Sequence, residues 1–323
     1  MEQKKYQKIY DRLNKYNNSS YTRKIKKWVA TEKVHGSNFS VYYSSACGFR
    51  FAKRNSFLEE GEWFYNYQLI RMRLEKGVKK ISELLGGVGV IVYGELFGGW
   101  YPDNPKTWTG SSERIDSNGV CLVPQECRAI QEGIYYSPNI EYMVFDVMVE
   151  GRGFLGFVEM NDVVKKAGLF VCEPLKIGTY NQLLNYNIVF DSTIPEQLGW
   201  GALPRGTNLA EGIVIKPYST NDRCLVKIKN KKFLEVSSSF DMKKAGKSYK
   251  FVLTGLINQN RFQAVISKIG RLTEENKQQV LEDYVEDVWM DLYQNYPNIK
   301  IDNYNDAHDF VKERSTVIVD NNL

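Results

Sequence analysis

The sequence contains few of the residues that build zinc sites and disulfide frameworks. Its 323 residues include two histidines, His35 and His308. Its five cysteines are Cys47, Cys121, Cys127, Cys172 and Cys224. Their odd number and the lack of any Cys-x-x-Cys spacing argue against both kinds of site. Any metal would have to be held by oxygen ligands, and we expect a reducing compartment.

Long hydrophobic runs are also missing. No apolar stretch approaches the roughly 20 residues that a membrane-spanning helix needs. The first residues are basic but are not followed by the apolar stretch of a secretory signal. We therefore expect no membrane association and no export. The length allows about two domains with a sizeable core.

Charge is unevenly distributed along the chain, whose net charge is +5. Lysines and arginines crowd the first 27 residues and recur from Lys227 to Lys232, whereas Glu274 to Asp291 is acidic. This pattern fits a protein that meets a polyanion on one face. Solvated surface lysines explain it equally well.

Alternating or compact apolar runs predict strands in the first part of the chain. The predicted strands are Phe39 to Tyr43, Phe49 to Lys53, Val88 to Tyr93, Glu141 to Val149, Gly212 to Lys216 and Leu225 to Lys229. Helices are predicted for Trp63 to Leu74 and Met160 to Ala167. Because strands and helices do not alternate regularly, we predict an α+β domain built on antiparallel sheet over residues 1–236.

A different composition follows this domain. Residues 237–250 are polar and small, as in a linker. Beyond them, Thr273 is placed to cap a helix with Glu274 and Glu275 in its first turn, and apolar residues then recur at helical spacing. We predict a small all-α C-terminal domain over residues 251–323.

Lys33 opens the segment Lys33-Val34-His35-Gly36-Ser37-Asn38, which suits a lysine nucleophile. An ordinary lysine amine, with a pKa of about 10.4, is protonated and must lose its proton to attack. Neighbouring cations favour the neutral amine and also bind an anionic substrate. The spacing alone is unspecific, because Lys165 and Lys243 are also followed by glycine three positions on.

Further candidates lie downstream. Arg54 follows a short strand, and Glu95 comes directly after a predicted buried strand, among glycines that would let a ligand approach the backbone. Asp146 interrupts an apolar strand and needs a cation or a donor if it is buried. The adjacent Phe145 would either stack on a base or belong to the core.

An acid and a base stand at the two ends of one predicted strand, at Glu211 and Lys216. Lys227 and Lys229 are two positions apart on the next strand, so both should point to the same face. Same-face lysines repel unless an anion lies between them, and a phosphate is the natural candidate. Together these residues are suited to phosphoryl transfer with Mg²⁺ held by carboxylates.

In order and spacing, these motifs resemble those of covalent nucleotidyltransferases. The chain is most similar to the RNA ligase 2 family of phages and to the kinetoplastid RNA-editing ligases, over residues 30 to 235. DNA ligases and capping enzymes usually carry an aspartate where this chain has His35. The resemblance therefore favours RNA ligation over those two alternatives, and over a non-catalytic nucleic-acid-binding relative.

The resemblance implies an ATP-dependent RNA ligase that forms a lysyl-AMP intermediate on Lys33, with His35 orienting the departing pyrophosphate. It implies catalytic roles for Lys33, His35, Lys227 and Lys229. The residues implied in nucleotide binding are Glu32, Asn38, Arg54, Glu95, Phe145, Lys216, Lys227 and Lys229. Glu211 and Asp146 would handle Mg²⁺ or Mn²⁺.

The implied partner is RNA with 5′-phosphate and 3′-hydroxyl ends, in duplex or nicked form. We expect a monomer in the cytoplasm, or in the host cytoplasm if the protein is viral. One departure from the family concerns the segment between Glu95 and Asp146, which is longer than in the phage relatives. The surplus around residues 104–124 looks like a polar surface loop that either shapes an RNA groove or decorates the surface.

Overall fold

A computed structural model describes Lys4 and residues 24–102, 114–115, 121–122, 129–131, 133–220, 224–233 and 249–323. The chain divides into two compact units, residues 1–230 and 231–323. The boundaries 1–236, 237–250 and 251–323 stay a prediction. Residues 237–248 of the predicted linker lie outside the described residues.

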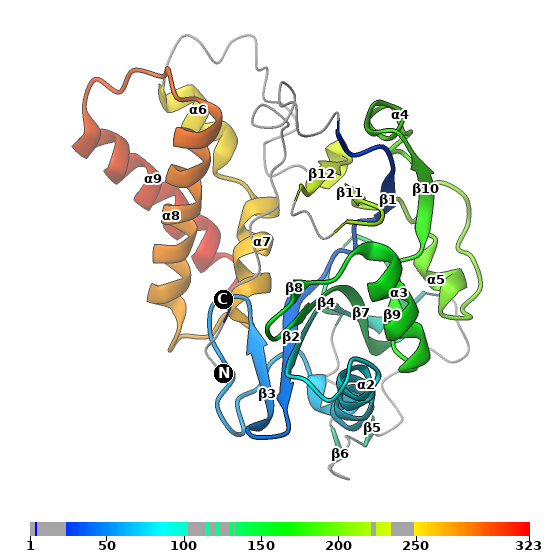
Figure 1. The fold of residues 1–323 in the computed structure, drawn as a ribbon. Coiled ribbons are helices and arrows are strands. Elements are labelled where there is room, and N and C mark those ends of the chain that lie inside the picture. Colours follow the sequence, from blue (N-terminus) through cyan, green and yellow to red (C-terminus); the bar gives the residue numbers. More distant parts are fainter. Residues whose placement is uncertain are drawn as a thin grey trace. The chain divides into compact units, whose positions relative to one another are not determined.

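The first unit is built on two antiparallel sheets (Figure 1). One has the order β3-β2-β4-β7-β8, with β9 added to β7 as a parallel strand. Its strands are β2 (Ser37–Ser44), β3 (Gly48–Lys53), β4 (Val90–Trp100), β7 (Ser137–Val149), β8 (Gly153–Phe154) and β9 (Phe170–Val171).

The other sheet has the order β10-β1-β11-β12. Its strands are β1 (Trp28–Glu32), β10 (Pro174–Gly178), β11 (Gly212–Pro217) and β12 (Val226–Lys229). Two short helices, α4 (Tyr180–Leu184) and α5 (Ile194–Gln197), lie between β10 and β11 in the chain. The predicted α+β architecture with antiparallel sheets is confirmed.

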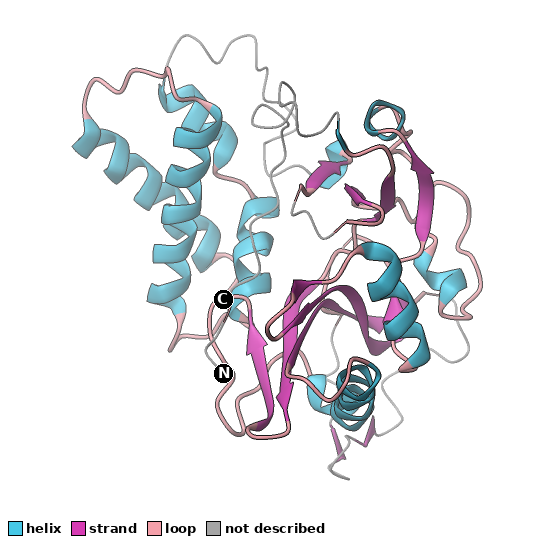
Figure 2. Cartoon of the chain, in the orientation of Figure 1, coloured by secondary structure: helices cyan, strands magenta, loops and turns pink. Residues whose placement is uncertain are grey.

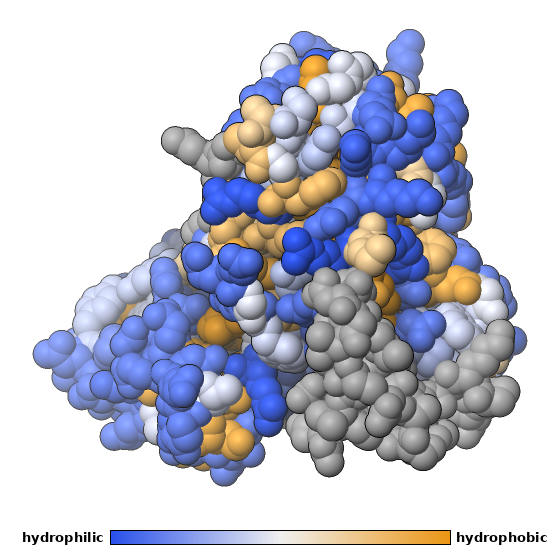
Figure 3. All heavy atoms as spheres, turned by 90° about the horizontal axis from the view of Figure 1, so that it is seen from below, coloured by the Kyte–Doolittle hydropathy of each residue, from blue (hydrophilic) through white to orange (hydrophobic). Residues whose placement is uncertain are grey.

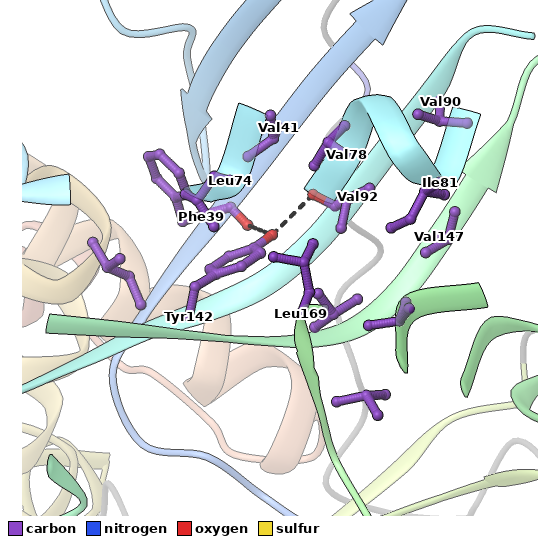
Figure 4. Packing of buried hydrophobic residues seen from close by; sticks show 14 of the residues in the cluster. Phe39, Val41, Leu74, Val78, Ile81, Val90, Val92, Tyr142, Val147 and Leu169 are labelled. Atoms are coloured by element: carbon purple, nitrogen blue, oxygen red, sulfur yellow. Dashed lines mark hydrogen bonds between the residues drawn. The ribbon is translucent and has the colours of Figure 1, made fainter. Parts of the chain in front are cut away.

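Helices α2 (Arg71–Leu84) and α3 (Phe157–Lys166) pack on one face of the larger sheet. Their apolar residues, such as Leu74, Val78 and Met160, join those of β2, β4 and β7 in one buried cluster. Tyr142 crosses this core and donates its hydroxyl proton between the carbonyls of Phe39 and Val92, at 3.1 and 2.9 Å (Figure 4). The core fixes the sheet from which several site residues project.

Several predicted boundaries are wrong, among them the start of one helix and the end of one strand. The helix predicted from Trp63 cannot start there, because Tyr65 and Asn66 adopt positive φ angles of 48° and 55°, outside the helical region. A 3-10 turn, η2 (Tyr67–Ile70), leads into α2 instead. The predicted strand ending at Tyr93 in fact continues to Trp100, so Glu95 lies inside β4 rather than after it.

The reason for the second error is packing. Gly94 lies inside the continuous strand, where a Cβ would collide with the Tyr142 ring and the Met143 carbonyl oxygen. Glycine is therefore needed here by the close approach of a neighbouring strand, not by a turn. The proposed surface loop at 104–124 lies mostly outside the described residues, apart from a two-stranded pair, β5 (Arg114–Ile115) with β6 (Cys121–Leu122).

The second unit is helical, as predicted (Figure 2). After a short 3-10 turn, η4 (Lys231–Phe233), its described elements are α6 (Tyr249–Leu256), α7 (Gln259–Ile269), α8 (Lys277–Asn295) and α9 (Tyr304–Asp320). They enclose their own apolar cluster. Thr273 exchanges hydrogen bonds with Asn276 in the turn before α8, so the helix begins three residues later than the predicted cap implied.

Hydrophilic residues dominate the face drawn in Figure 3, and hydrophobic residues show only in patches between them. Each unit thus keeps most of its apolar side chains in its own core. Over the described ranges, the model holds no helix with the length and apolar character to cross a membrane.

Candidate active site

The turn after β1 carries Lys33 to a buried carboxylate. The backbone N–H of Lys33 donates to the Gly212 carbonyl at 2.9 Å, which extends the pairing of β1 with β11. Its side-chain amine donates to Oε2 of Glu211 at 2.6 Å. Nδ1 of His35 lies 3.5 Å from the same oxygen. Lys33 and His35 of one motif therefore both lie close to Glu211, the acid that precedes β11.

Glu211 is shared between two lysines. Nζ of Lys229 lies 3.2 Å from its Oε1, while Lys33 holds Oε2. Burial alone would raise the pKa of Glu211, but the positive charges of Lys33 and Lys229 outweigh it and hold the pKa well below its usual value. The carboxylate is 2% exposed and stays ionised. The sequence predicted cations around Lys33; the structure adds an acid in contact with the amine.

The register of β11 with β12 confirms that Lys227 and Lys229 share one face. Lys227 lies opposite Val214 and Lys229 opposite Gly212. The other face of this strand pair, with Ile213, belongs to an apolar cluster. The two amines therefore project from the side of the sheet that does not contribute to that cluster.

Glu95 is close to the same centre. Burial raises its pKa to about 7, although the positive charges of Lys33 and Arg54 and a hydrogen bond from the Gly36 backbone N–H lower it. Asn38 on β2 lies directly opposite Glu95 in the register of the larger sheet. Arg54 follows the last residue of β3, as predicted. These residues form the side of the site contributed by the larger sheet.

An irregularity in β7 brings Phe145 and Asp146 to one side. Tyr93 pairs with Asp146 and Gly94 pairs with Val144, so Phe145 is an extra residue, a β-bulge. Phe145 packs partly buried against the cluster of Tyr93, away from the main core. Asp146 is 3% exposed, opposite Tyr93.

Lys216 ties β11 to this bulge. Its amine donates to the Phe145 carbonyl at 2.7 Å and lies 5.1 Å from the centre of the Phe157 ring. The predicted base at the end of the strand is thus only 7% exposed, and it is paired with a backbone oxygen. Lys216 and Phe145 therefore belong to one part of the site.

Glu32 precedes the nucleophile candidate and points into the protein. Its Oε2 accepts from the backbone N–H and the hydroxyl of Thr193, at 2.8 and 3.0 Å. Burial raises its pKa to about 7, although the hydrogen bonds from Ser192 and Thr193 lower it. Its other oxygen, Oε1, is buried without a hydrogen-bond partner in the part of the chain that the model describes. A buried oxygen without a partner is a candidate acceptor for a donor on a ligand.

Sequence reasoning missed three residues that shape the site. Tyr136 accepts a hydrogen bond from the His35 backbone, Thr193 holds Glu32, and Asn208 binds the backbone of Tyr135. None belongs to a recognisable motif. Tyr136 is 101 positions from His35, so neither periodicity nor spacing connects them.

A complete metal site does not exist among the described residues, where no group of three or more His, Cys, Asp and Glu side chains is placed to hold an ion. Glu211 and Asp146 would each supply one carboxylate. Mg²⁺ commonly takes only one or two carboxylates and completes its shell with water and substrate phosphates. The residues present fit an ion held jointly with a phosphorylated substrate.

Two family models match the chain, and they match different units. The RNA ligase model covers residues 26–229, and the T4 RNA ligase 2 C-terminal model covers residues 251–319. The first match alone includes most of the chain and every site residue described above. The chain belongs to the RNA ligase family.

Similar proteins include two mitochondrial RNA-editing ligases of Trypanosoma brucei brucei. RNA-editing ligase 2 is 30% identical over 207 residues, which are 58% of this chain and 48% of that protein. RNA-editing ligase 1 is 28% identical over 250 residues, 68% of this chain and 51% of that protein. The chain thus spans about half the length of each relative.

Solved structures of a Naegleria gruberi RNA ligase are also similar. A variant with ATP and Mn is 15% identical, with a TM-score of 0.41 over 67% of this chain and 53% of that one. An apo variant is 15% identical, with a TM-score of 0.45 over 72% of this chain and 57% of that one.

Proposed function

We propose that this protein is an ATP-dependent RNA ligase whose nucleophile is Lys33. The observation that carries the proposal is the contact of the Lys33 amine with the buried Glu211, which Lys229 and His35 also approach. This arrangement places the Lys33 amine beside a carboxylate and an imidazole, which can exchange protons, and near a second amine, which can bind phosphate. Membership of the RNA ligase family supports the same assignment.

Three transfers make up the reaction. The neutral Lys33 amine attacks the α-phosphorus of ATP; a P–N bond forms, the bond to the β-phosphate breaks and pyrophosphate leaves. An oxygen of an RNA 5′-phosphate then attacks the AMP phosphorus, and the lysine leaves and regains its proton. Finally an RNA 3′-hydroxyl attacks the activated 5′-phosphate, and AMP departs as the strand is sealed.

The cations of the site would serve the first and last transfers. Lys227 and Lys229 project from one face and would contact the AMP phosphate, while His35 would orient the leaving pyrophosphate. Lys33 must leave Glu211 and lose a proton before it attacks, because a protonated amine has no lone pair. Glu211 holds the amine in place until then.

The nucleotide would lie between the site residues of the larger sheet and those of the smaller sheet. Arg54 and Glu95 would hold the ribose, Asn38 would support the adenylylated lysine, and Phe145 would stack on the adenine ring. The unpartnered Oε1 of Glu32 would accept a hydrogen bond from an N–H of the base. Lys216, fixed next to Phe145, would handle phosphate.

A divalent ion, Mg²⁺ or Mn²⁺, would be held by Glu211 and Asp146 together with phosphate oxygens and water. When bound, it would act as a Lewis acid and shield the phosphate charge. Because Glu211 also binds Lys33, an ion at this carboxylate and the amine would compete for it. Release of the amine and binding of the ion are therefore linked.

The RNA substrate would carry a 5′-phosphate and a 3′-hydroxyl, in a duplex or at a nick. The helical unit, matched by the T4 RNA ligase 2 C-terminal model, would engage the RNA or position its ends. We further propose that the protein acts as a monomer in a reducing compartment, the cytoplasm. Cys47, Cys172 and Cys224 are free thiols, which fits that environment.

The direct test is label transfer from α-labelled ATP in the presence of Mg²⁺. A labelled protein band on a denaturing gel is expected for the wild type and for Lys26→Ala, an exposed lysine before β1. The band should vanish in Lys33→Ala. If the wild type takes no label, or Lys33→Ala keeps it, the proposed nucleophile is wrong.

The substrate is tested by sealing assays on single-stranded, nicked, gapped and RNA/DNA hybrid ends. We expect the nicked RNA duplex to be sealed fastest. Label from GTP, or sealing of DNA nicks alone, would favour a capping enzyme or a DNA ligase instead. Truncation after residue 236 should leave label transfer intact and slow sealing; unchanged sealing would remove the proposed role of the helical unit.

A further inference from the structure

Tyr136 is a buried tyrosine that touches the nucleophile turn. Its hydroxyl oxygen accepts a hydrogen bond from the backbone N–H of His35 at 3.0 Å. The side chain is fully buried, and its ring packs edge-on against Phe97, with ring centres 5.2 Å apart. The oxygen is thus held at one place beside the turn from Lys33 to Gly36.

The preceding residue holds the other side of the site. The backbone N–H and carbonyl of Tyr135 bond to the side-chain amide of Asn208, at 2.8 and 2.7 Å. Asn208 is 3% exposed and lies three positions before Glu211. Two consecutive residues therefore hold both chain segments that meet in the Lys33–Glu211 pair.

The state of the hydroxyl supports this role. Burial and the nearby carboxylates of Glu32, Glu211 and Glu95 raise the pKa of Tyr136 well above its usual value. The phenol therefore keeps its proton, and its oxygen serves as a neutral acceptor for the His35 N–H. Without the hydroxyl, that N–H would lose this acceptor.

We infer that Tyr136 is a positioning residue for the transfer of AMP to Lys33, an inference that rests on the proposed function. Its hydroxyl fixes the His35 backbone, so that the Lys33 amine and the His35 imidazole face Glu211 together. Asn208 does the same for the segment that carries Glu211. Tyr136 acts through its hydrogen bond to the His35 backbone.

The test is Tyr136→Phe, which keeps the ring and removes the hydroxyl. Its control is Tyr284→Phe in the helical unit, which also loses one hydrogen bond of a buried tyrosine hydroxyl, to the Asn258 carbonyl. Three quantities are compared with the wild type: hydrogen–deuterium exchange at the His35 amide, the single-turnover rate of label transfer at saturating ATP, and the KM for ATP.

For Tyr136→Phe we expect amide exchange at His35 to become about tenfold faster and label transfer to become about tenfold slower. Each effect corresponds to the loss of one hydrogen bond. The KM should stay within about twofold, because the ATP contacts remain. Tyr284→Phe should change none of the three. An unchanged transfer rate in Tyr136→Phe overturns the inference, whether or not exchange rises.

Failure of the proposed function gives a different result: the wild type itself takes no label. If Tyr136→Phe does not fold, Asn208→Asp replaces it, since it keeps the acceptor for Tyr135 N–H and removes the donor to the Tyr135 carbonyl. Slower label transfer with a KM near the wild-type value supports the inference. An unchanged rate overturns it.

Discussion

Lys33 and Glu211, 178 positions apart in the sequence, meet at 2.6 Å in the structure. Their contact joins the turn after β1 to the start of β11, the two segments held by Tyr136 and Asn208. Because Lys229 binds the other oxygen of Glu211, the carboxylate separates two amines that would otherwise repel each other.

Glu211→Gln should therefore slow label transfer from ATP to Lys33. The substitution preserves the shape of the side chain and removes the charge that holds Lys33 and Lys229. Hydrogen bonds to charged groups contribute about 1.5–3 kcal/mol, so we expect a loss of about 10- to 100-fold. Glu150→Gln, at an exposed acid of the same unit, is the control. Equal rates for the two variants would contradict this prediction.

Glu32 should make stability fall as the pH rises. With a folded pKa of about 7 and an ordinary value of 4.5, it is protonated in the folded state and ionised in the unfolded chain between these pH values. The folded state then binds more protons, so the free energy of unfolding decreases across this window. Below pH 4.5 the group contributes no pH dependence, because both states are protonated.

Glu32→Gln should remove this slope. Between pH 5 and pH 7.5 the variant should lose less stability than the wild type, by about 2 kcal/mol. Urea unfolding at both pH values measures the difference, and Glu196→Gln, at an exposed acid on α5, should behave as the wild type. Parallel pH profiles for wild type and Glu32→Gln would show that the folded carboxyl is not kept protonated.

Gly36→Ala should both destabilise the protein and slow label transfer. A Cβ at Gly36 would lie well inside contact distance of the Leu96 carbonyl oxygen and 3.1 Å from Cγ of Glu95. Overpacking of this kind costs about 1–3 kcal/mol. Gly201→Ala is the matched control, since nothing lies within 4 Å of its Cβ. Thermal unfolding and label transfer measure both effects; a Gly36→Ala protein as stable and active as Gly201→Ala would refute the steric argument.

Arg261→Leu should weaken the helical unit. Arg261 is 1% exposed and binds Asp287 at 2.6 Å and also Asp291, so its loss removes a buried cation from two partly buried carboxylates, of which Asp287 keeps Lys268 at 2.9 Å. Breaking a buried ion pair in this way costs about 3–5 kcal/mol. The urea midpoint of the helical circular dichroism signal measures it, with Arg314→Leu at an exposed position of α9 as control. Similar urea midpoints for the two variants would contradict a stabilising role for the ion pairs of Arg261.

Much of the fold could be predicted because it follows from the regular spacing of apolar side chains along strands and helices. Each of the six predicted strands corresponds to an observed one, since alternating burial leaves a trace in the sequence. The strand predicted from the sequence ends at Tyr93, which places Glu95 after it. The reason for a glycine at position 94, the Tyr142 ring on the neighbouring strand, belongs to tertiary packing and leaves no local signal.

The candidate site likewise contains residues that could be predicted from the sequence and residues that could not. Lys33, His35, Glu211 and Lys229 were selected by motif, and the structure brings these four into contact. The partners that hold them were not predictable: Tyr136, Thr193 and Asn208 act through backbone groups or single hydrogen bonds across long separations. Motifs identify groups that react, whereas supporting contacts depend on the folded path of the chain.

The bulge in β7 has a consequence for how ligand specificity can change in this fold. In a regular strand, neighbouring residues face opposite sides, so an aromatic ring and an acid on one side must be two positions apart. The extra residue at Phe145 lets consecutive positions share a side. Deleting Val144 would restore the alternation and turn Phe145 toward the apolar core, away from the side of Asp146. A single-residue deletion would thus cost the site more than most substitutions, although it removes no charged group.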